Sequence, residues 1–289
     1  MASSQFHLSS LSSTDFDWHQ ALSLASASEL VYGNEAEVKS TANQWGLESV
    51  VFIDRDDTQC FLAKHENIVL IAFRGTTEIG DWITNLTLRS TRRPYGKVHS
   101  GFVIGFEDVE SEIEAQLRSI TSQIGRKPTV LLTGHSLGGA LAIIAAAELQ
   151  GEYIVSGVYT CGQPAVGRHS FHEFIREQYA DKYHRFVNDN DIVTRLPPTY
   201  SHVGDLYHFD ENGDLKHDAE ALRIAVEDEC EGPETLSTSE FRDLRKRMSK
   251  SSDLQDGATR GDLPLFRKHA ISRYIELIAN AVPKNQEAE

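Results

Sequence analysis

The feature that most constrains the fold is an abrupt turn from a strand into a helix around Ser136. The apolar run Val130-Leu131-Leu132-Thr133 predicts a buried strand, and the Ala-rich run of residues 140–147 predicts a buried helix. Only Gly-His-Ser-Leu-Gly-Gly, residues 134–139, separates the two runs. Glycines two residues before and after a serine allow a sharp bend that exposes the hydroxyl, the pattern of a nucleophile elbow. A helix start that merely needs small residues for packing would not explain the serine, so we predict that Ser136 is a nucleophile.

Strand patterns and helix patterns alternate along most of the chain. Apolar or alternating runs predict strands over residues 49–53, 59–63, 67–73, 129–133, 154–159 and 184–187, and Asn212-Gly213 predicts a later hairpin. Helical periodicity predicts helices over residues 15–31, 34–45, 105–124, 137–149, 169–180 and 268–281. This alternation predicts an α/β fold with a mostly parallel central sheet and helices on both faces.

The length of the chain predicts one domain over residues 1–289. Residues 1–14 are rich in serine and are predicted to be a loose lead-in, and residues 218–262 are rich in charge, Ser and Gly and are predicted to be a surface insertion. Within the insertion, Ser237 and Glu240 form a possible capping box for one short helix. The sequence suggests no role for this insertion.

Charge and cysteine content exclude several function classes. The net charge is -15, which argues against nucleic acid as a partner and against anionic membrane surfaces, while neutral lipid remains accessible. The three cysteines are too few and too scattered for a disulfide framework or a zinc site, and we expect no metal and no organic cofactor.

The N-terminal residues and the apolar runs bear on localisation. Residues 1–17 lack the basic start and the apolar core of a secretion signal. No uninterrupted apolar run approaches the ~18 residues of a membrane span, so no integral membrane segment is expected. We therefore expect a cytoplasmic protein.

A serine nucleophile needs a base and an acid that orients the base, which on this architecture follow the serine in the order acid, then histidine. Asp191 comes just past the predicted strand that ends near residue 187, and Asp189 is its close alternative. His269 opens the last predicted helix and is the preferred base, with His202 as the main alternative. Other acids and histidines after the serine are Asp181, Asp205, His208 and His217.

Acyl transfer also needs hydrogen-bond donors for a developing oxyanion. One expected donor is the backbone N–H of Leu137, directly after the nucleophile. The predicted strand over residues 67–73 runs into Arg74-Gly75-Thr76-Thr77, so Thr76 is expected to supply the second donor through its N–H and hydroxyl.

The chain contains the short motifs IAFRGT, DWITNL, KVHSGF, TGHSLGGA, GQPAVG and NDIVTRLPP, which begin at residues 71, 81, 97, 133, 162 and 190. Together these motifs resemble the class 3 lipases, the fungal-type triacylglycerol lipase family. The resemblance spans roughly residues 20–217 and 264–282. It implies an α/β-hydrolase fold with Ser136 as nucleophile, Asp191 as acid and His269 as base, and it implies Thr76 and Leu137 as the oxyanion hole.

The segment after Thr76 bears on the substrate. Ile79, Trp82, Ile83 and Leu86 have the spacing of one apolar face of a short helix. From the residues alone, an ordinary surface helix packed on the core is the preferred interpretation. The resemblance instead implies a lid over an acyl pocket.

We therefore expect a serine ester hydrolase of lipase type that cleaves acylglycerols or related lipid esters, at a neutral lipid–water interface. The alternatives are a hydrolase of small esters or phospholipids, and a non-catalytic lipase-like interaction module. The presence of all the expected catalytic and oxyanion residues argues against the last. The sequence does not indicate an oligomeric state.

Overall fold

The computed structural model describes residues 6–217, 235–251 and 264–283. Its centre is an eight-stranded sheet in the order β1-β2-β3-β6-β7-β8-β9-β10. Strands β3, β6, β7, β8 and β9 are parallel, and antiparallel strands complete both ends. The strands are β1 Glu48–Arg55, β2 Thr58–His65, β3 Ile68–Phe73, β6 Thr129–His135, β7 Ile154–Cys161, β8 Tyr183–Asn188, β9 Asp205–Phe209 and β10 Leu215–His217.

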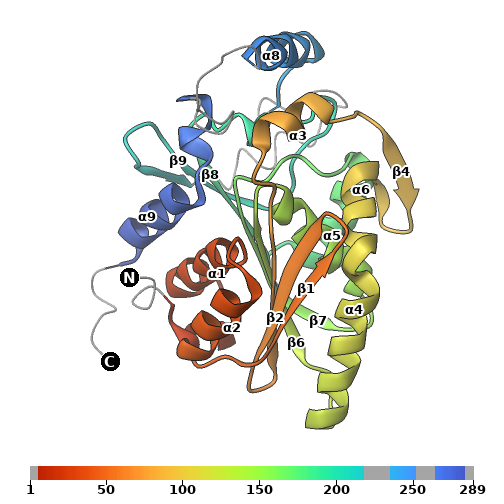
Figure 1. The fold of residues 1–289 in the computed structure, drawn as a ribbon, viewed down its shortest axis with the longest axis vertical. Coiled ribbons are helices and arrows are strands. Elements are labelled where there is room, and N and C mark those ends of the chain that lie inside the picture. The colour runs from red at the N-terminus through yellow and green to blue at the C-terminus, as the bar shows by residue number, and fades with distance from the viewer. Residues whose placement is uncertain (1–5, 218–234, 252–263, 284–289) are drawn as a thin grey trace.

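Helices cover both faces of this sheet, which confirms the predicted architecture (Figure 1). Helices α1, α2 and α9 pack on one face, and α4, α5 and α6 on the other. The helices are α1 Trp18–Leu30, α2 Glu35–Gln44, α3 Ile79–Asn85, α4 Ser100–Ile124, α5 Leu137–Leu149, α6 His169–Tyr179, α8 Thr238–Ser251 and α9 Ile271–Ala281, with 3-10 helices η2 Leu8–Ser12, η3 Val193–Arg195 and η5 Pro264–His269.

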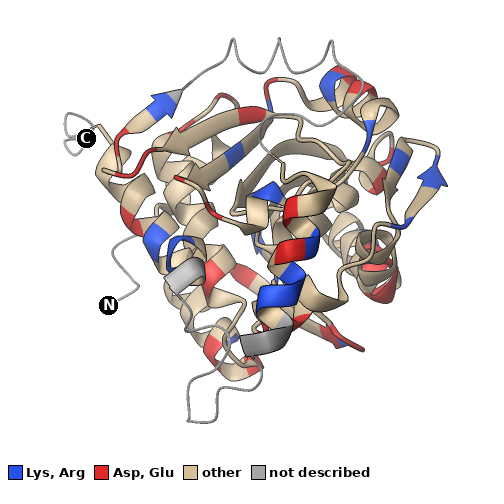
Figure 2. Ribbon diagram, turned by 90° about the horizontal axis from the view of Figure 1, so that it is seen from above, with Lys and Arg blue, Asp and Glu red and all other residues tan. Residues whose placement is uncertain are grey.

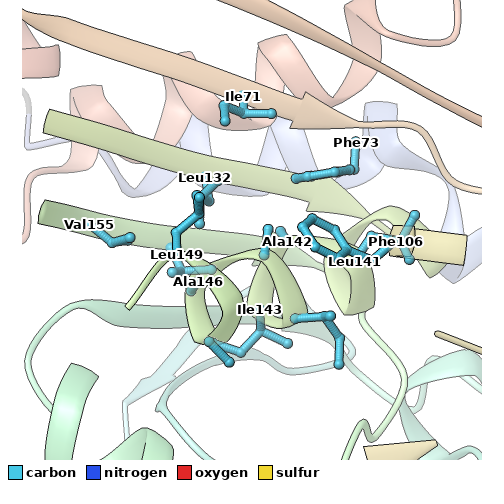
Figure 3. Packing of buried hydrophobic residues seen from close by; sticks show 14 of the residues in the cluster. Ile71, Phe73, Phe106, Leu132, Leu141, Ala142, Ile143, Ala146, Leu149 and Val155 are labelled. Carbon is cyan, nitrogen blue, oxygen red and sulfur yellow. The ribbon is translucent and has the colours of Figure 1, made fainter. Parts of the chain in front are cut away.

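The core under α4 and α5 shows why the central strands are apolar on both faces. Ile71, Leu132 and Val155 on neighbouring strands are buried in one cluster with Leu141 of α5 and Phe106 of α4 (Figure 3). Helix α5 is buried along nearly its whole length. Because its alanine side chains are small, the helix can lie close to the sheet.

The register of the parallel strands aligns their carboxyl ends along one edge. Phe73 pairs with Gly134, and Cys161 pairs with both His135 and Phe186. The loops that follow β3, β6, β7 and β8 therefore emerge side by side. In open α/β sheets this edge is where ligands bind.

Three local features differ from the sequence predictions. A short hairpin, β4 Ser90–Arg93 and β5 Gly96–His99, was not predicted because its polar residues lack an alternating pattern. The extended backbone of Ala270 separates η5 from α9, so His269 lies in the 3-10 turn before the helix. Within the predicted lead-in, residues 6–14 include η2, which is anchored because its Leu11 is buried.

Helix α8 lies in the predicted insertion, whose remaining residues fall largely outside the described part of the chain. The predicted capping box is confirmed: Ser237 N–H donates to Glu240 over 2.8 Å, and Glu240 N–H donates to the Ser237 hydroxyl over 3.3 Å. Figure 1 shows α8 lying above α3, away from the sheet. The extent of the single domain remains a prediction.

Candidate active site

Ser136 occupies a strained backbone position between β6 and α5. Its φ of 59° and ψ of -130° lie in a region that residues other than glycine rarely adopt. The Ser136 N–H donates to Cys161 O over 2.9 Å, and Ser136 O accepts from Gly139 N over 3.0 Å. These bonds tie the bend to β7 on one side and to the first turn of α5 on the other.

The glycines around Ser136 are required by close backbone approach. A Cβ atom at Gly134 would lie 2.2 Å from the backbone of Gly138. A Cβ atom at Gly138 would lie 2.1 Å from Phe73 O on β3. Both distances are shorter than any real carbon contact, so a larger residue at either position would push the helix away from the sheet.

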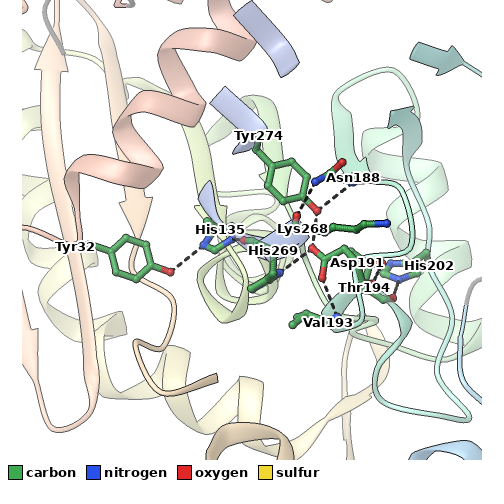
Figure 4. A network of polar contacts seen from close by, with 10 residues as sticks. All are labelled: Tyr32, His135, Asn188, Asp191, Val193, Thr194, His202, Lys268, His269 and Tyr274. Atoms are coloured by element: carbon green, nitrogen blue, oxygen red, sulfur yellow. Dashed lines mark hydrogen bonds and ion pairs between the residues drawn. The ribbon is translucent and has the colours of Figure 1, made fainter. Parts of the chain in front are cut away.

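The structure brings Asp191 and His269 together at the same sheet edge. Their side chains are fully buried, and His269 Nδ1 lies 2.7 Å from Asp191 Oδ2 (Figure 4). Asp191 also accepts hydrogen bonds from Val193 N–H over 3.0 Å and from the Tyr274 hydroxyl over 2.6 Å. The carboxylate is therefore held from three sides, and it accepts a hydrogen bond from His269 Nδ1–H.

The alternative residues have other partners. Asp189 forms an ion pair with Lys268 and has a positive φ of 47°. His202 Nε2 lies 2.6 Å from Thr194 O, and His208 Nε2 lies 2.9 Å from Asp189 O. Asp205 lies 3.7 Å from His184, and Asp181 is exposed in the turn before β8. His217 is the last residue of β10.

Two contacts connect Ser136 with the Asp191–His269 pair. His135, directly before the serine, places its Nε2 2.6 Å from His269 O. Gly162, directly after the Cys161 carbonyl that accepts from Ser136, has no room for a side chain: a Cβ atom there would lie 3.0 Å from both Asp191 Oδ2 and His269 Nδ1. Within the described residues, Ser136 Oγ and His269 Nε2 are both buried and have no hydrogen-bond partner.

Three residues that the sequence did not indicate support this arrangement. Tyr274 donates to Asp191, and burial followed by the nearby carboxylate raises the pKa of its hydroxyl well above the ordinary value, so it stays a donor. His135 is buried, which lowers its pKa well below the ordinary value, as does neighbouring His269. A neutral His135 donates from Nε2 and accepts at Nδ1 from the Tyr32 hydroxyl over 3.0 Å. Tyr274 was recognised only as part of the apolar stripe of the last helix.

The two predicted oxyanion residues lie beside the bend. Leu137 is the first residue of α5, where backbone N–H groups have no partner within the helix. Thr76 follows Gly75, at which a Cβ atom would lie 3.0 Å from Ser136 Cβ. The Thr76 hydroxyl accepts from Glu78 N–H over 3.2 Å, which also fixes the start of α3.

The predicted helix after Thr76 is present as α3, which ends before Leu86. Ile83 and Leu86 are buried, while Ile79 and Trp82 are half-buried. All four belong to a small apolar cluster, here called the lid cluster. Its buried members are Ile83, Leu86, Ile192, Val193, Leu196, Leu236, Phe241, Leu244, Met248 and Phe266. Because Ile192 and Val193 directly follow Asp191, α3 is packed on the loop that carries this carboxylate.

The described residues contain no group of three or more His, Cys, Asp or Glu side chains placed to share a metal ion. None of the helices in that part of the chain is both long enough and apolar enough to cross a bilayer.

Comparison with known proteins shows which proteins this chain is similar to. Residues 70–201 match the family model described as lipase (class 3). A lipase of Rhizomucor miehei is 36% identical over 171 residues, an alignment that covers 54% of this chain and 46% of that protein. A secreted mono- and diacylglycerol lipase of Fusarium solani is 33% identical over 172 residues, covering 57% and 49%. The chain thus spans about half the length of the curated relatives it matches.

Solved structures agree with this result. A triacylglycerol lipase whose catalytic centre is formed by a serine protease triad superimposes with a TM-score of 0.58 and 28% identity. The match covers 71% of this chain and 87% of that one.

The comparisons correct one prediction. The cytoplasmic localisation is wrong, because the similar proteins include fungal lipases, one of them named as secreted, and these point to an extracellular protein. The prediction relied on the composition of residues 1–17. That composition carries no information about the folded part of the chain, which is the part that the relatives share.

The family model, the related sequences and the superimposed structures therefore agree with the strand-to-helix bend and the mostly parallel sheet: this chain has an α/β-hydrolase fold, and its residues 70–201 match the class 3 lipase family.

Proposed function

We propose that this protein is a serine ester hydrolase of lipase type that cleaves acylglycerols or related lipid esters through an acyl-enzyme on Ser136. The observation that carries the proposal is the strained Ser136 beside a fully buried Asp191–His269 pair. Nδ1 of His269 donates a hydrogen bond to Asp191. Because the proton is on Nδ1, the lone pair of Nε2 can accept a second proton.

In the proposed reaction, Ser136 Oγ attacks the ester carbonyl and its proton passes to His269 Nε2. Asp191 stabilises the resulting imidazolium and keeps the ring oriented. The N–H groups of Leu137 and Thr76, with the Thr76 hydroxyl, would bind the oxyanion. His269 then protonates the leaving alcohol, and a water molecule activated by the same ring releases the acid from Ser136.

The proposed substrate class follows from the apolar cover. Ser136 and His269 are 0% exposed, so substrate enters only after something moves. We propose that α3 is this lid, because its apolar side chains pack on the loop after Asp191. Each aliphatic side chain contributes about 1.5–3 kcal/mol when buried, and a lipid surface would replace that burial when the helix opens.

The test is labelling with a fluorophosphonate probe, followed by assays on acylglycerols, phospholipids and p-nitrophenyl esters of increasing chain length. Wild type should be labelled once and should prefer long acyl chains. Ser136→Ala should lose both labelling and hydrolysis, while the control Ser156→Ala should keep both.

The same assays separate the alternatives. Hydrolysis restricted to short soluble esters would indicate an esterase, and a preference for phospholipids would indicate a phospholipid acyl hydrolase. A folded wild-type protein that is neither labelled nor active would contradict the proposal and favour a non-catalytic interaction module.

A further inference from the structure

Helix α8 has one apolar face and one basic face. Phe241, Leu244 and Met248 are buried in the lid cluster. The exposed side carries four cations, Arg242, Arg245, Lys246 and Arg247, and two carboxylates, Glu240 and Asp243. Figure 2, which views the molecule from above, shows Lys and Arg gathered on the C-terminal half of this helix. Because the apolar face packs inward, the exposed side of α8 can meet a lipid surface only through its charges, and clustered Lys and Arg attract anionic headgroups.

Helix α8 is attached to the proposed lid. Arg245 donates to Thr84 O near the end of α3 over 2.5 Å, and its guanidinium lies 5.7 Å from the centre of the Phe241 ring. The buried face of α8 shares the lid cluster with Ile83 of α3. A surface that binds α8 therefore lies next to α3.

A groove of about 600 Å³ runs between α8 and the segment after α3. Apolar side chains of Leu86, Leu88 and Phe241 line it together with three cationic ones, Arg242, Arg245 and Lys246. This lining matches an amphiphile that has an anionic headgroup attached to an apolar chain.

The local charge differs in sign from the charge of the whole chain, which is -15. Of the acids on α8, Glu240 is engaged in the capping box with Ser237, and Asp243 lies 3.7 Å from Lys246. Glu78 and Asp81 are the acids at the start of α3. Attraction to a charged surface falls off within about 8–10 Å at ordinary ionic strength, so the exposed cations of α8 act on a surface that this helix contacts.

We propose that α8 docks the protein on lipid surfaces that carry anionic headgroups. Its exposed cations contact the headgroup phosphates, and the groove beside Phe241 accepts the upper part of an acyl chain. This differs from the neutral interface expected from net charge alone. The consequence for catalysis rests on the proposed lipid ester hydrolysis, whereas the docking itself does not.

The experiment measures binding of Ser136→Ala protein to vesicles by co-sedimentation. The vesicles contain either phosphatidylcholine alone or phosphatidylcholine with phosphatidylglycerol. Binding should be stronger to the anionic vesicles and should weaken as salt is added. Each cation near an anionic surface contributes roughly fivefold to binding, so Arg242→Gln with Lys246→Gln should lower it about twenty-fivefold.

The matched control is Lys39→Gln with Arg118→Gln, which removes two exposed cations from α2 and α4. It should bind as the parent does, and thermal unfolding should verify that both double variants are folded. Equal binding to both vesicle types, or equal losses in the two double variants, would overturn the proposal. So would tight binding of monomeric oleate without preference for anionic vesicles, since the groove would then be a fatty-acid site.

Because the serine is absent from the test protein, docking and hydrolysis are judged separately. Vesicle binding through α8 without any esterase activity in wild type would leave the docking proposal intact and remove the proposed function. Hydrolysis by wild type without a preference for anionic vesicles would leave the proposed function intact and contradict the docking proposal.

Discussion

The sheet edge around Ser136 and the α3–α8 region above it are built in opposite ways. At the sheet edge, Asp191 and His269 are 0% exposed, and backbone or side-chain hydrogen bonds hold the carboxylate. The α3–α8 region packs around the small lid cluster, and its outer side is charged and exposed. The sheet edge is part of the main core, whereas the α3–α8 region packs around a separate and smaller apolar cluster.

This difference assigns the chemical step to the sheet edge and substrate entry to the α3–α8 region. Proton transfer requires groups fixed within a fraction of an ångström in surroundings that exclude water. Entry of a substrate requires a segment that opens at limited cost, and such segments have few buried contacts. Substitutions at the sheet edge should therefore change the rate of the chemical step, and substitutions in α3 should change how the rate depends on a lipid surface.

The largest effect is expected at the acid. Asp191→Asn keeps the shape but no longer holds His269 in the required tautomer, so kcat should fall on the order of 10⁴-fold. Asp189→Asn is the matched control, because Asp189 pairs with Lys268 instead. The measurement is kcat on a soluble p-nitrophenyl ester. If Asp189→Asn were the more damaging variant, the wrong carboxylate would have been assigned.

Thr76 lies where the two regions meet. Thr76→Val retains the N–H but removes the hydroxyl, and loss of one oxyanion donor should lower kcat roughly 10²-fold with little change in KM. The same hydroxyl accepts from Glu78 at the start of α3, so the variant should also loosen this helix. An unchanged kcat would mean that the hydroxyl does not contact the transition state.

Buried histidines occur in the main part of the fold but not in α3 or α8, so they should make the stability of that main part depend on pH. Burial lowers the pKa of His135 well below the ordinary value, and it lowers that of His172 to about 4, whereas neither α3 nor α8 contains a histidine. A lowered folded pKa means that the unfolded chain binds more protons below the unfolded pKa of about 6.5, so stability is present above this pH and is lost as pH falls.

For His172, the free energy of unfolding should fall by about 2 kcal/mol between pH ~7 and pH ~5. His172→Gln should show a smaller loss over the same interval, measured by urea unfolding at both pH values. Equal pH dependence in the two proteins would show that His172 does not titrate in this way.

Tyr274 tests how far the positioning of the acid matters. Tyr274→Phe removes the hydrogen bond to Asp191, and a bond to a charged group is worth about 1.5–3 kcal/mol, so kcat should fall about tenfold or somewhat more. The lost bond should also shift the acid limb of the kcat–pH profile, which a purely structural defect would not do. Tyr32→Phe, which acts one residue further away through His135, should have a smaller effect.

The smallest effect on the chemical step is expected in α3. Trp82 is half-buried and stacks near Phe102, with 6.4 Å between ring centres. Trp82→Ser should leave hydrolysis of soluble esters within about twofold, because Trp82 packs on Phe102 and the lid cluster and takes no part in the chemical step. With a lipid substrate, wild type should show a jump in rate at the solubility limit, and the variant should show a weaker one. Ordinary saturation in wild type would indicate that α3 is not a lid.

The sequence by itself determined the features that depend on neighbours in the chain. The bend at Ser136 follows from glycines two residues away on each side, and its strand and helix follow from apolar runs of different period. The capping box of α8 likewise needs only Ser237 and Glu240, three residues apart. Local sterics and local hydrogen bonds decide such features, so a single sequence carries them.

The tertiary structure decided which distant residues meet. Asp191 and Asp189 are two residues apart, and the sequence favours Asp191 with Asp189 as its close alternative. The turn after β8 directs Asp191 to His269 and Asp189 to Lys268. Tyr274 and Asp191 are separated by 83 residues, and His135 and the His269 carbonyl by 134. The sequence offered no sign of these contacts, because residues far apart in the chain are brought together by the packing of α9 against the sheet.

The distribution of charge over the surface was also decided by the tertiary structure. The net charge of -15 is a sum over the chain and favours a neutral interface, whereas the fold collects several cations on one side of α8, next to the proposed lid. Electrostatic attraction is screened over about 10 Å, so a lipid surface responds to the charges nearest to it. Only the packing of α8 on α3 determines which charges those are.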